Sequence, residues 1–125
     1  MKGLMIDCSR NAVMNVESIK KFVLTMEKLR YDTLLLYVED TYEIEGEPLF
    51  GHLRGRYSKA ELREVDAFCN AHHIELVPCI QTLAHLNAIF KWHDAYDKIN
   101  DCDDILLVDD DETYKLIDRM LSTMA

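Results

Sequence analysis

The sequence is poor in positive charge. Its 14 lysine and arginine residues are outnumbered by 23 aspartate and glutamate residues, so the formal net charge is -9 at pH 7. A nucleic-acid groove requires a stripe of basic side chains, and an anionic membrane surface attracts basic rather than acidic proteins. The composition therefore argues against nucleic acid and membranes as partners.

Long apolar runs are also missing from the sequence. No apolar segment approaches the roughly 20 residues that a membrane-spanning helix needs. Met1-Lys2 is followed at once by a short strand-like run, which does not resemble the apolar core of a signal peptide. These two absences predict a cytoplasmic location.

Cysteine pairs at metal-binding spacing are missing as well. The cysteines are Cys8, Cys69, Cys79 and Cys102. They contain no C-x-x-C pair, and we interpret them as reduced thiols. His72 and His73 are adjacent on a predicted helix, where neighbours face different directions and chelate a metal poorly. We therefore expect neither a metal nor a cofactor.

Three apolar, strand-like runs each end abruptly at a polar cluster. The clusters are residues 7–10 after the run 4–6, Glu39-Asp40 after the run 33–38, and residues 81–85 after the run 74–80. A helical pattern separates each run from the next, which is the order of consecutive β-α units with parallel strands. Because the strand ends of such units point one way, we expect the three clusters to form a site at one rim.

Capping residues mark the two helices between these runs. Asn15 is a favourable N-cap, and apolar residues follow it at helical spacing up to Leu29. Ser58 and Glu61 form an S-x-x-E capping box at the start of the second helix, which should end near His73.

The connection after the second run is long. It covers residues 41–57, and residues 42–47 are expected to fold back as a hairpin around Gly46. Loops of this length in compact domains are usually functional or disordered. Arg54 and Arg56, near the end of the loop, are interpreted as solvated side chains in loop turns.

The last third of the sequence predicts less regular structure. Residues 86–92 suggest a short helix, and residues 105–108 suggest either a fourth strand or an extended loop. The acidic run at residues 109–112 starts the last helix, because negative charge suits a helix N-terminus. The expected buried stripe of that helix is Tyr114, Ile117, Leu121 and Met124. Three or four strands do not close a parallel barrel, which needs eight strands and about 250 residues.

Four segments of the sequence resemble, in order, a known series of motifs. Residues 5–11 resemble the pattern D-x-x-R-h, residues 34–40 resemble L-x-L-H-L-T-D-D, residues 74–85 resemble I-x-V-I-P-E-I-D-x-P-G-H, and residues 110–120 resemble T-Y-x-F-L-x-x-L. This series resembles the catalytic barrel of glycoside hydrolase family 20, the β-N-acetylhexosaminidases. The resemblance implies that residues 1–125 form a single α/β domain, the N-terminal part of a TIM (β/α)8 glycosidase barrel with about three β-α units.

Several positions depart from the family pattern. Glu39 stands where the family usually has Asp, and Cys79 and Gln81 replace a Glu and an Asp. Leu83-Ala84 replaces Pro-Gly. These departures suggest a divergent branch similar to the shorter bacterial exo-N-acetylglucosaminidases, and hence a bacterial source.

The resemblance also implies a reaction. Family 20 enzymes remove a terminal N-acetyl-hexosamine and use the acetamido oxygen of the substrate as the nucleophile. Their catalytic Asp-Glu pair lies in an H-I-G-x-D-E motif at the end of the fourth strand, and no such motif occurs in the 125 residues. The chain is therefore expected to be a truncated domain with no catalytic residue of its own, inactive in isolation.

Substrate binding is the role that the resemblance leaves to this chain. Arg10 matches the arginine that grips the hydroxyls of the terminal sugar, because its fork of donors suits two neighbouring hydroxyls. The other interpretation of Arg10 is a salt bridge to Asp7 or Glu39. Asp7 is expected to hold Arg10, and Asp40 either contacts the sugar or caps its loop. Glu39 and His85 match a carboxylate–histidine pair that supports the catalytic acid.

Two other functions remain open from the sequence. A receiver-type signalling domain would use Asp7 and Asp40 as an acidic pocket, but it needs five parallel strands and a lysine after the fifth. A non-catalytic module for sugar binding or assembly would carry the same rim without the chemistry.

Self-association follows from the same architecture. A barrel interrupted after three units leaves strand edges and apolar faces uncovered, and such surfaces seek partners. We therefore expect an oligomer that forms through the open barrel edge, with an N-acetyl-hexosamine glycan as the ligand of each chain.

Overall fold

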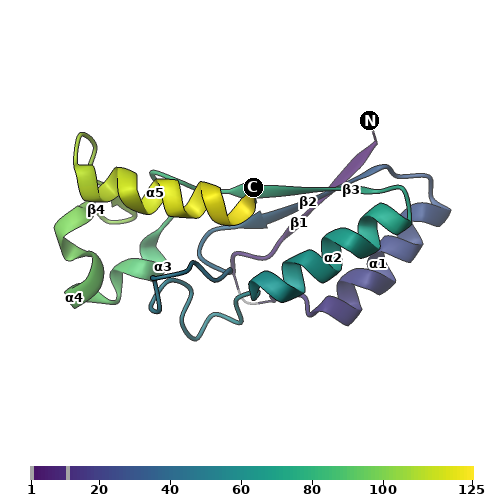
Figure 1. Cartoon of the computed structure of the whole chain (residues 1–125), viewed down its shortest axis with the longest axis horizontal. Coiled ribbons are helices and arrows are strands. Elements are labelled where there is room, and N and C mark those ends of the chain that lie inside the picture. The colour runs from purple at the N-terminus through teal and green to yellow at the C-terminus, as the bar shows by residue number, and fades with distance from the viewer. Residues whose placement is uncertain (1, 11) are drawn as a thin grey trace.

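Three parallel strands form the central sheet of this α/β chain (Figure 1). The computed structural model describes residues 2–10 and 12–125; Met1 and Asn11, the last residue of the segment 5–11, lie outside the described part. The strands are β1 (Gly3–Asp7), β2 (Thr33–Val38) and β3 (Glu75–Ile80), in the order β1-β2-β3. The expected strands are thus confirmed to within one residue at each end.

The register of the sheet brings the strand ends level with one another. Asp7 pairs with Tyr37, and Tyr37 pairs with Cys79. The polar clusters that follow the three strands therefore begin at the same edge of the sheet, as parallel β-α units require.

Three helices accompany the sheet, and side-chain caps start each of them. They are α1 (Val16–Lys28), α2 (Lys59–Ala71) and α5 (Asp111–Met124). Asn15 accepts a 2.9 Å hydrogen bond from the backbone N–H of Ser18, and Ser58 and Glu61 form the expected capping box. Asp110 caps α5 by accepting from two backbone N–H groups of its first turn. No helix in the described part of the chain is long and apolar enough to cross a membrane.

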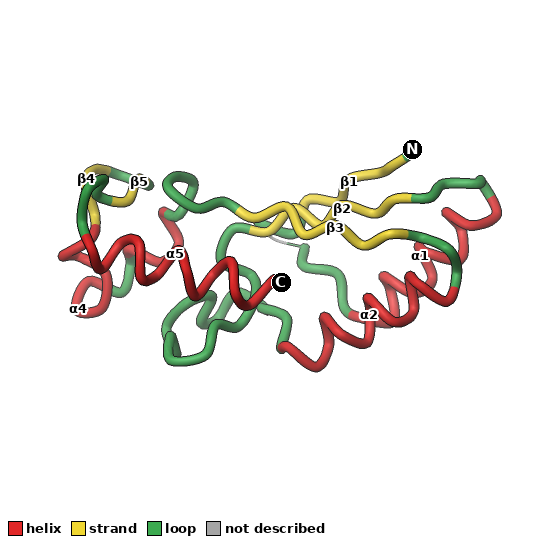
Figure 2. The backbone as a smooth tube through the Cα atoms, turned by 45° about the horizontal axis from the view of Figure 1, so that its top comes forward, coloured by secondary structure: helices red, strands yellow, loops and turns green. Residues whose placement is uncertain are grey.

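The sheet is covered by helices on one face and open on the other (Figure 2). Leu34, Leu36 and Val38 alternate along β2 and are buried, and Leu36 and Val38 lie beside residues of α2. Met5 lies on the opposite face, in register with Leu35, and it is 55% exposed. Alternate residues of a strand point to opposite faces, so Met5 and Leu35 share the face that no described helix covers. In a (β/α)8 barrel the helices lie outside, so this open face corresponds to the barrel interior.

Two long connections pack against each other beyond the strand ends. One runs from β2 to α2. The other contains α3 (Asn87–Phe90), α4 (His93–Tyr96), the 3-10 turn η1 (Asp97–Ile99) and an antiparallel ribbon of β4 (Asn100–Cys102) and β5 (Ile105–Leu106). Both contribute buried side chains to the core, among them Tyr42, Phe50, Ile89, Tyr96 and Leu106.

A carboxylate ties the two connections to the last helix. Glu47, from the first connection, accepts a 3.0 Å hydrogen bond from the hydroxyl of Tyr96 in the second. The other oxygen of Glu47 forms an ion pair with Arg119 of α5. The side chain of Glu47 is 17% exposed, so these contacts hold three segments together in a partly buried setting.

The expected hairpin at residues 42–47 is wrong. Tyr42 instead forms a bridge with Tyr57, at the far end of the same loop. Backbone hydrogen bonds from Tyr57 N–H to Thr41 O and from Glu43 N–H to Tyr57 O hold these two ends together. The turn at Gly46 does form, because Glu47 N–H donates to Ile44 O at 3.1 Å, but no strand pairing flanks it within the described residues. Tyr42 and Ile44 are buried in the core instead, and this burial favours the course that the loop takes.

The expectations for the last third need two further corrections. Residues 105–106 form β5, which pairs with β4 outside the main sheet and is not a fourth parallel strand. The buried residues of α5 are Thr113, Leu116 and Met120, whereas Tyr114 and Leu121 are 43% and 49% exposed. Helical spacing fitted both faces, and packing against the second connection selected the face that carries Leu116. The main sheet has three described strands, which is short of the five of a receiver domain.

We predict that Gly51→Ala destabilises the chain far more than Gly46→Ala. Both glycines have a positive φ, 65° and 84°, so alanine at either position costs about 1–2 kcal/mol. A Cβ on Gly51 would lie 2.0 Å from the carbonyl oxygen of Asp40, whereas one on Gly46 would have nothing within 4 Å. The free energy of unfolding in urea should fall by more than about 3 kcal/mol for Gly51→Ala. Equal losses in the two variants would contradict the close packing of Gly51 on Asp40.

Candidate functional site

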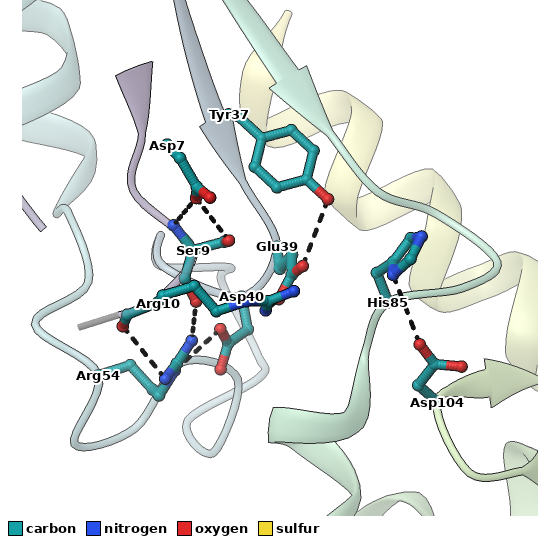
Figure 3. A network of polar contacts seen from close by, with 9 residues as sticks. All are labelled: Asp7, Ser9, Arg10, Tyr37, Glu39, Asp40, Arg54, His85 and Asp104. Atoms are coloured by element: carbon teal, nitrogen blue, oxygen red, sulfur yellow. Dashed lines mark hydrogen bonds and ion pairs between the residues drawn. The ribbon is translucent and has the colours of Figure 1, made fainter. Parts of the chain in front are cut away.

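The end of β2 places a buried carboxylate beside an exposed guanidinium (Figure 3). Arg10 Nη1 lies 2.6 Å from Glu39 Oε2, and the side chains are 65% and 3% exposed respectively. The hydroxyl of Tyr37 donates to the other oxygen of Glu39 at 3.3 Å. The hydrogen bond and charge of Glu39 raise the pKa of Arg10 above its ordinary value, so Arg10 is a permanent cation.

The end of β1 forms a tight polar turn around Asp7. Asp7 Oδ1 accepts hydrogen bonds from the backbone N–H of Ser9 at 2.8 Å and from its hydroxyl at 2.6 Å. The hydroxyl and then the backbone bond lower the pKa of Asp7 below its ordinary value of 3.8. The expectation that Asp7 holds Arg10 is corrected in part: Asp7 bonds Ser9, two residues on, and acts on Arg10 through charge alone. The aspartate side chain is short, so its carboxylate hydrogen-bonds a nearby backbone N–H group rather than a distant side chain.

Asp40 lies below this rim and pairs with an arginine from the long loop. Its side chain is 1% exposed, and Arg54 Nε donates to Asp40 Oδ1 at 3.1 Å. Of the two interpretations of Asp40, the structure favours the loop contact over contact with a sugar. Arg54 was interpreted as solvated, and that was wrong, because its side chain is only 21% exposed.

His85 faces a different carboxylate from the one expected. His85 Nδ1 lies 3.5 Å from Asp104 Oδ2, and no hydrogen bond within the described residues joins His85 to Glu39. Asp104 lies in the turn between β4 and β5. Leu86 N–H donates to Asp104 O at 3.1 Å, and this bond holds the turn beside His85. Glu39 is already engaged by Arg10 and Tyr37. His85 has a φ of 61°, which turns its side chain away from the helical direction of the residues that follow.

These side chains line one pocket of about 190 Å³ at the rim. Its lining residues are Arg10, Glu39, Arg54, His85, Asn87, Ala88 and Asp104. The structure therefore brings together three of the five predicted site residues, Arg10, Glu39 and His85, while Asp7 and Asp40 lie beside the pocket. The lining contains both donors and acceptors, which suits a ligand with several hydroxyl groups.

Sequence reasoning missed four lining residues of this pocket, of which Arg54 and Asp104 carry charge and Asn87 and Ala88 do not. The flanking glycines of Arg54, Gly51 and Gly55, have positive φ, and a Gly-rich turn in an overlong loop was the one available signal. Asp104 sits in an acidic run with no distinguishing pattern. Within residues 2–10 and 12–125, no group of three His, Cys, Asp or Glu side chains is placed to hold a metal ion.

The fold and the rim define a class of protein. Parallel β-α units with helices on one face of the sheet, and a polar pocket at the carboxyl ends of the strands, are the architecture of part of a (β/α)8 barrel. No protein-family model and no curated protein sequence matches the chain. Solved structures do match it.

Several of the matching structures are glycoside hydrolase family 20 enzymes. An exo β-N-acetylglucosaminidase from Vibrio harveyi, solved with N-acetylglucosamine, has a TM-score of 0.84 at 19% identity over 97% of this chain and 24% of its own. The β-N-acetylhexosaminidase from Bacteroides fragilis gives 0.82 at 20% identity, over 97% and 28%. That from Streptomyces coelicolor A3(2) gives 0.74 at 24% identity, over 96% and 29%.

These similarities establish the fold. The chain has the fold of a segment of a family 20 catalytic barrel, which confirms the partial barrel that the motifs implied. The chain spans less than a third of the length of each of these three proteins.

The hydrogen bonds of Asp7 predict a pH-dependent contribution to stability. Because the pKa of Asp7 is lower in the folded chain than its ordinary value of 3.8, its carboxylate stabilises the fold above that pH. The contribution is lost as pH falls through the lower pKa of the folded state. Asp7→Asn should therefore be less stable than the wild type at pH 7, and the difference should shrink below about pH 4.

Urea unfolding at several pH values tests this prediction. Ser9→Ala, which removes the hydroxyl donor to Asp7, should show a smaller change of the same sign. A stability difference between wild type and Asp7→Asn that is the same at pH 7 and pH 3 would contradict it.

Proposed function

We propose that the chain is a segment of a glycoside hydrolase that removes terminal N-acetyl-hexosamine, and that it forms the wall of the pocket for the terminal sugar. The observation that carries this proposal is Arg10, an exposed guanidinium held by the buried Glu39, at the carboxyl edge of a family 20 barrel segment. The similar Vibrio harveyi enzyme was solved with N-acetylglucosamine, which supports the choice of sugar.

Arg10 supplies the contact with the sugar. Its bond to Glu39 uses one terminal nitrogen, and the side chain remains 65% exposed. A guanidinium fixed at one end presents its other N–H groups in a plane, at a spacing that fits two adjacent hydroxyls. Holding the side chain before the sugar arrives also reduces the entropy lost on binding.

Catalysis requires groups beyond those of this segment. In the proposed reaction, the acetamido oxygen of the substrate attacks the anomeric carbon while a glutamic acid protonates the leaving oxygen. The Asp-Glu motif of the family has no counterpart in these 125 residues. Glu39 and His85 would support that acid from the rim, with Asp104 as the direct partner of His85. We expect the isolated chain not to turn over a nitrophenyl N-acetylglucosaminide above a buffer blank.

Sugar binding by the isolated chain tests the proposal directly. N-acetylglucosamine should perturb the NMR signals of residues at the rim, and Arg10→Lys should weaken binding by roughly 1–3 kcal/mol because one ammonium cannot replace the two-point contact. The matched control is Arg63→Lys, since Arg63 is exposed on α2 away from the rim. Equal affinity in wild type and Arg10→Lys would remove Arg10 from the site.

We also propose that the chain self-associates through the open face of its sheet. Met5 and Leu29 are both 55% exposed, but Met5 lies on the open face and Leu29 follows α1 on the covered side. Light scattering over a dilution series should show a dimer or larger assembly that Met5→Lys weakens and Leu29→Lys does not. A wild-type chain that remains monomeric at high concentration would contradict this proposal.

A further inference from the structure

Arg54 reaches from the long loop to the ends of two strands. Its Nε donates to Asp40 Oδ1 at 3.1 Å, just after β2. Its terminal nitrogens donate to the backbone carbonyls of Ser9 and, at 3.4 Å, of Arg10, just after β1. One planar guanidinium thus bonds a carboxylate and two carbonyl oxygens that belong to two different β-α units (Figure 3).

Two of the three residues that Arg54 contacts are buried. Ser9 and Asp40 are fully buried, and one oxygen of Asp40 has no hydrogen-bond partner among the described residues. Removing the cation from a buried carboxylate strongly destabilises the folded state. Arg54 therefore holds the segment 8–10 through its carbonyl oxygens. The hydrogen bonds between Asp7 and Ser9 close the turn of the same segment.

The loop is shaped to bring Arg54 to this position. Gly51 packs so closely on the carbonyl of Asp40 that no side chain fits there, and Gly55 has a φ of 66°. Leu53 also has a positive φ and is 82% exposed, so the turn points Leu53 outward and Arg54 inward.

Arg56, two residues further along, provides a natural comparison. Its side chain is 23% exposed, against 21% for Arg54. Within the described residues, however, Arg56 bonds its own loop alone, at the carbonyls of Pro48 and Phe50 and the carboxylate of Glu43. The two arginines share burial and loop but differ in whether they touch the backbone of Arg10.

We propose that Arg54 is a positioning residue for Arg10. By fixing the carbonyls of Ser9 and Arg10, it sets where the Arg10 side chain leaves the backbone, and so lets that side chain reach Glu39 and face the pocket. Lysine at position 54 cannot do this, because a single ammonium does not span a carboxylate and two carbonyls in a plane. The consequence for sugar binding rests on the proposed function, whereas the consequence for Arg10 itself does not.

The experiment compares Arg54→Lys with Arg56→Lys in the full 125-residue chain. Without sugar, the backbone amide and Nε–H NMR signals of Arg10 should shift in Arg54→Lys and stay in place in Arg56→Lys. With N-acetylglucosamine, Arg54→Lys should bind roughly fivefold to tenfold more weakly, and Arg56→Lys within about twofold of the wild type. If Arg54→Lys does not fold, Arg54→Gln combined with Asp40→Asn takes its place, because this pair removes the buried carboxylate together with its cation.

A double mutant separates positioning from a general loss of stability. If Arg54 acts through Arg10, adding Arg54→Lys to Arg10→Lys should weaken sugar binding no further. Full additivity, or unshifted Arg10 signals in folded Arg54→Lys, would overturn the inference. Shifted Arg10 signals in a chain whose wild type binds no N-acetylglucosamine would instead support the inference and reject the proposed function.

Discussion

Two buried carboxylates at the end of β2 control the architecture of the rim. The side chains of Glu39 and Asp40 are 3% and 1% exposed. An ionised carboxylate withdrawn from water needs a cation and hydrogen bonds to offset the lost solvation. Because adjacent residues point in different directions, the cations come from different segments: Arg10 from the end of β1 and Arg54 from the loop. The ends of β1, β2 and the loop are therefore arranged around two charges on consecutive residues.

This constraint explains which parts of the fold could be predicted from the sequence. Asn15 and the Ser58–Glu61 box act within three residues of themselves, so their helices were correctly predicted. The strands were equally local, since each is an apolar run with a sharp polar end. The stripe of α5 was misplaced because Leu116 and Ile117 both satisfy helical spacing, and only the packed partner decides between neighbouring faces.

The pocket residues that could be predicted are those that align with a motif of the family. Arg10, Glu39 and His85 do meet there, but the actual partners of Asp40 and His85 are Arg54 and Asp104. Both partners arrive through long connections whose course depends on burying Tyr42, Phe50 and Ile89. No local pattern encodes the path of such a loop, because its conformation follows from contacts between residues far apart in the sequence.

The contacts of Glu47 couple the lengths of the two long connections. One carboxylate bonds Tyr96 of the second connection and Arg119 of α5 while belonging to the first. An insertion or deletion in either connection would displace Glu47 or Tyr96. The other connection would then have to change in length or sequence to restore their hydrogen bond. In proteins that share this segment, the lengths of the two connections should therefore vary together rather than independently.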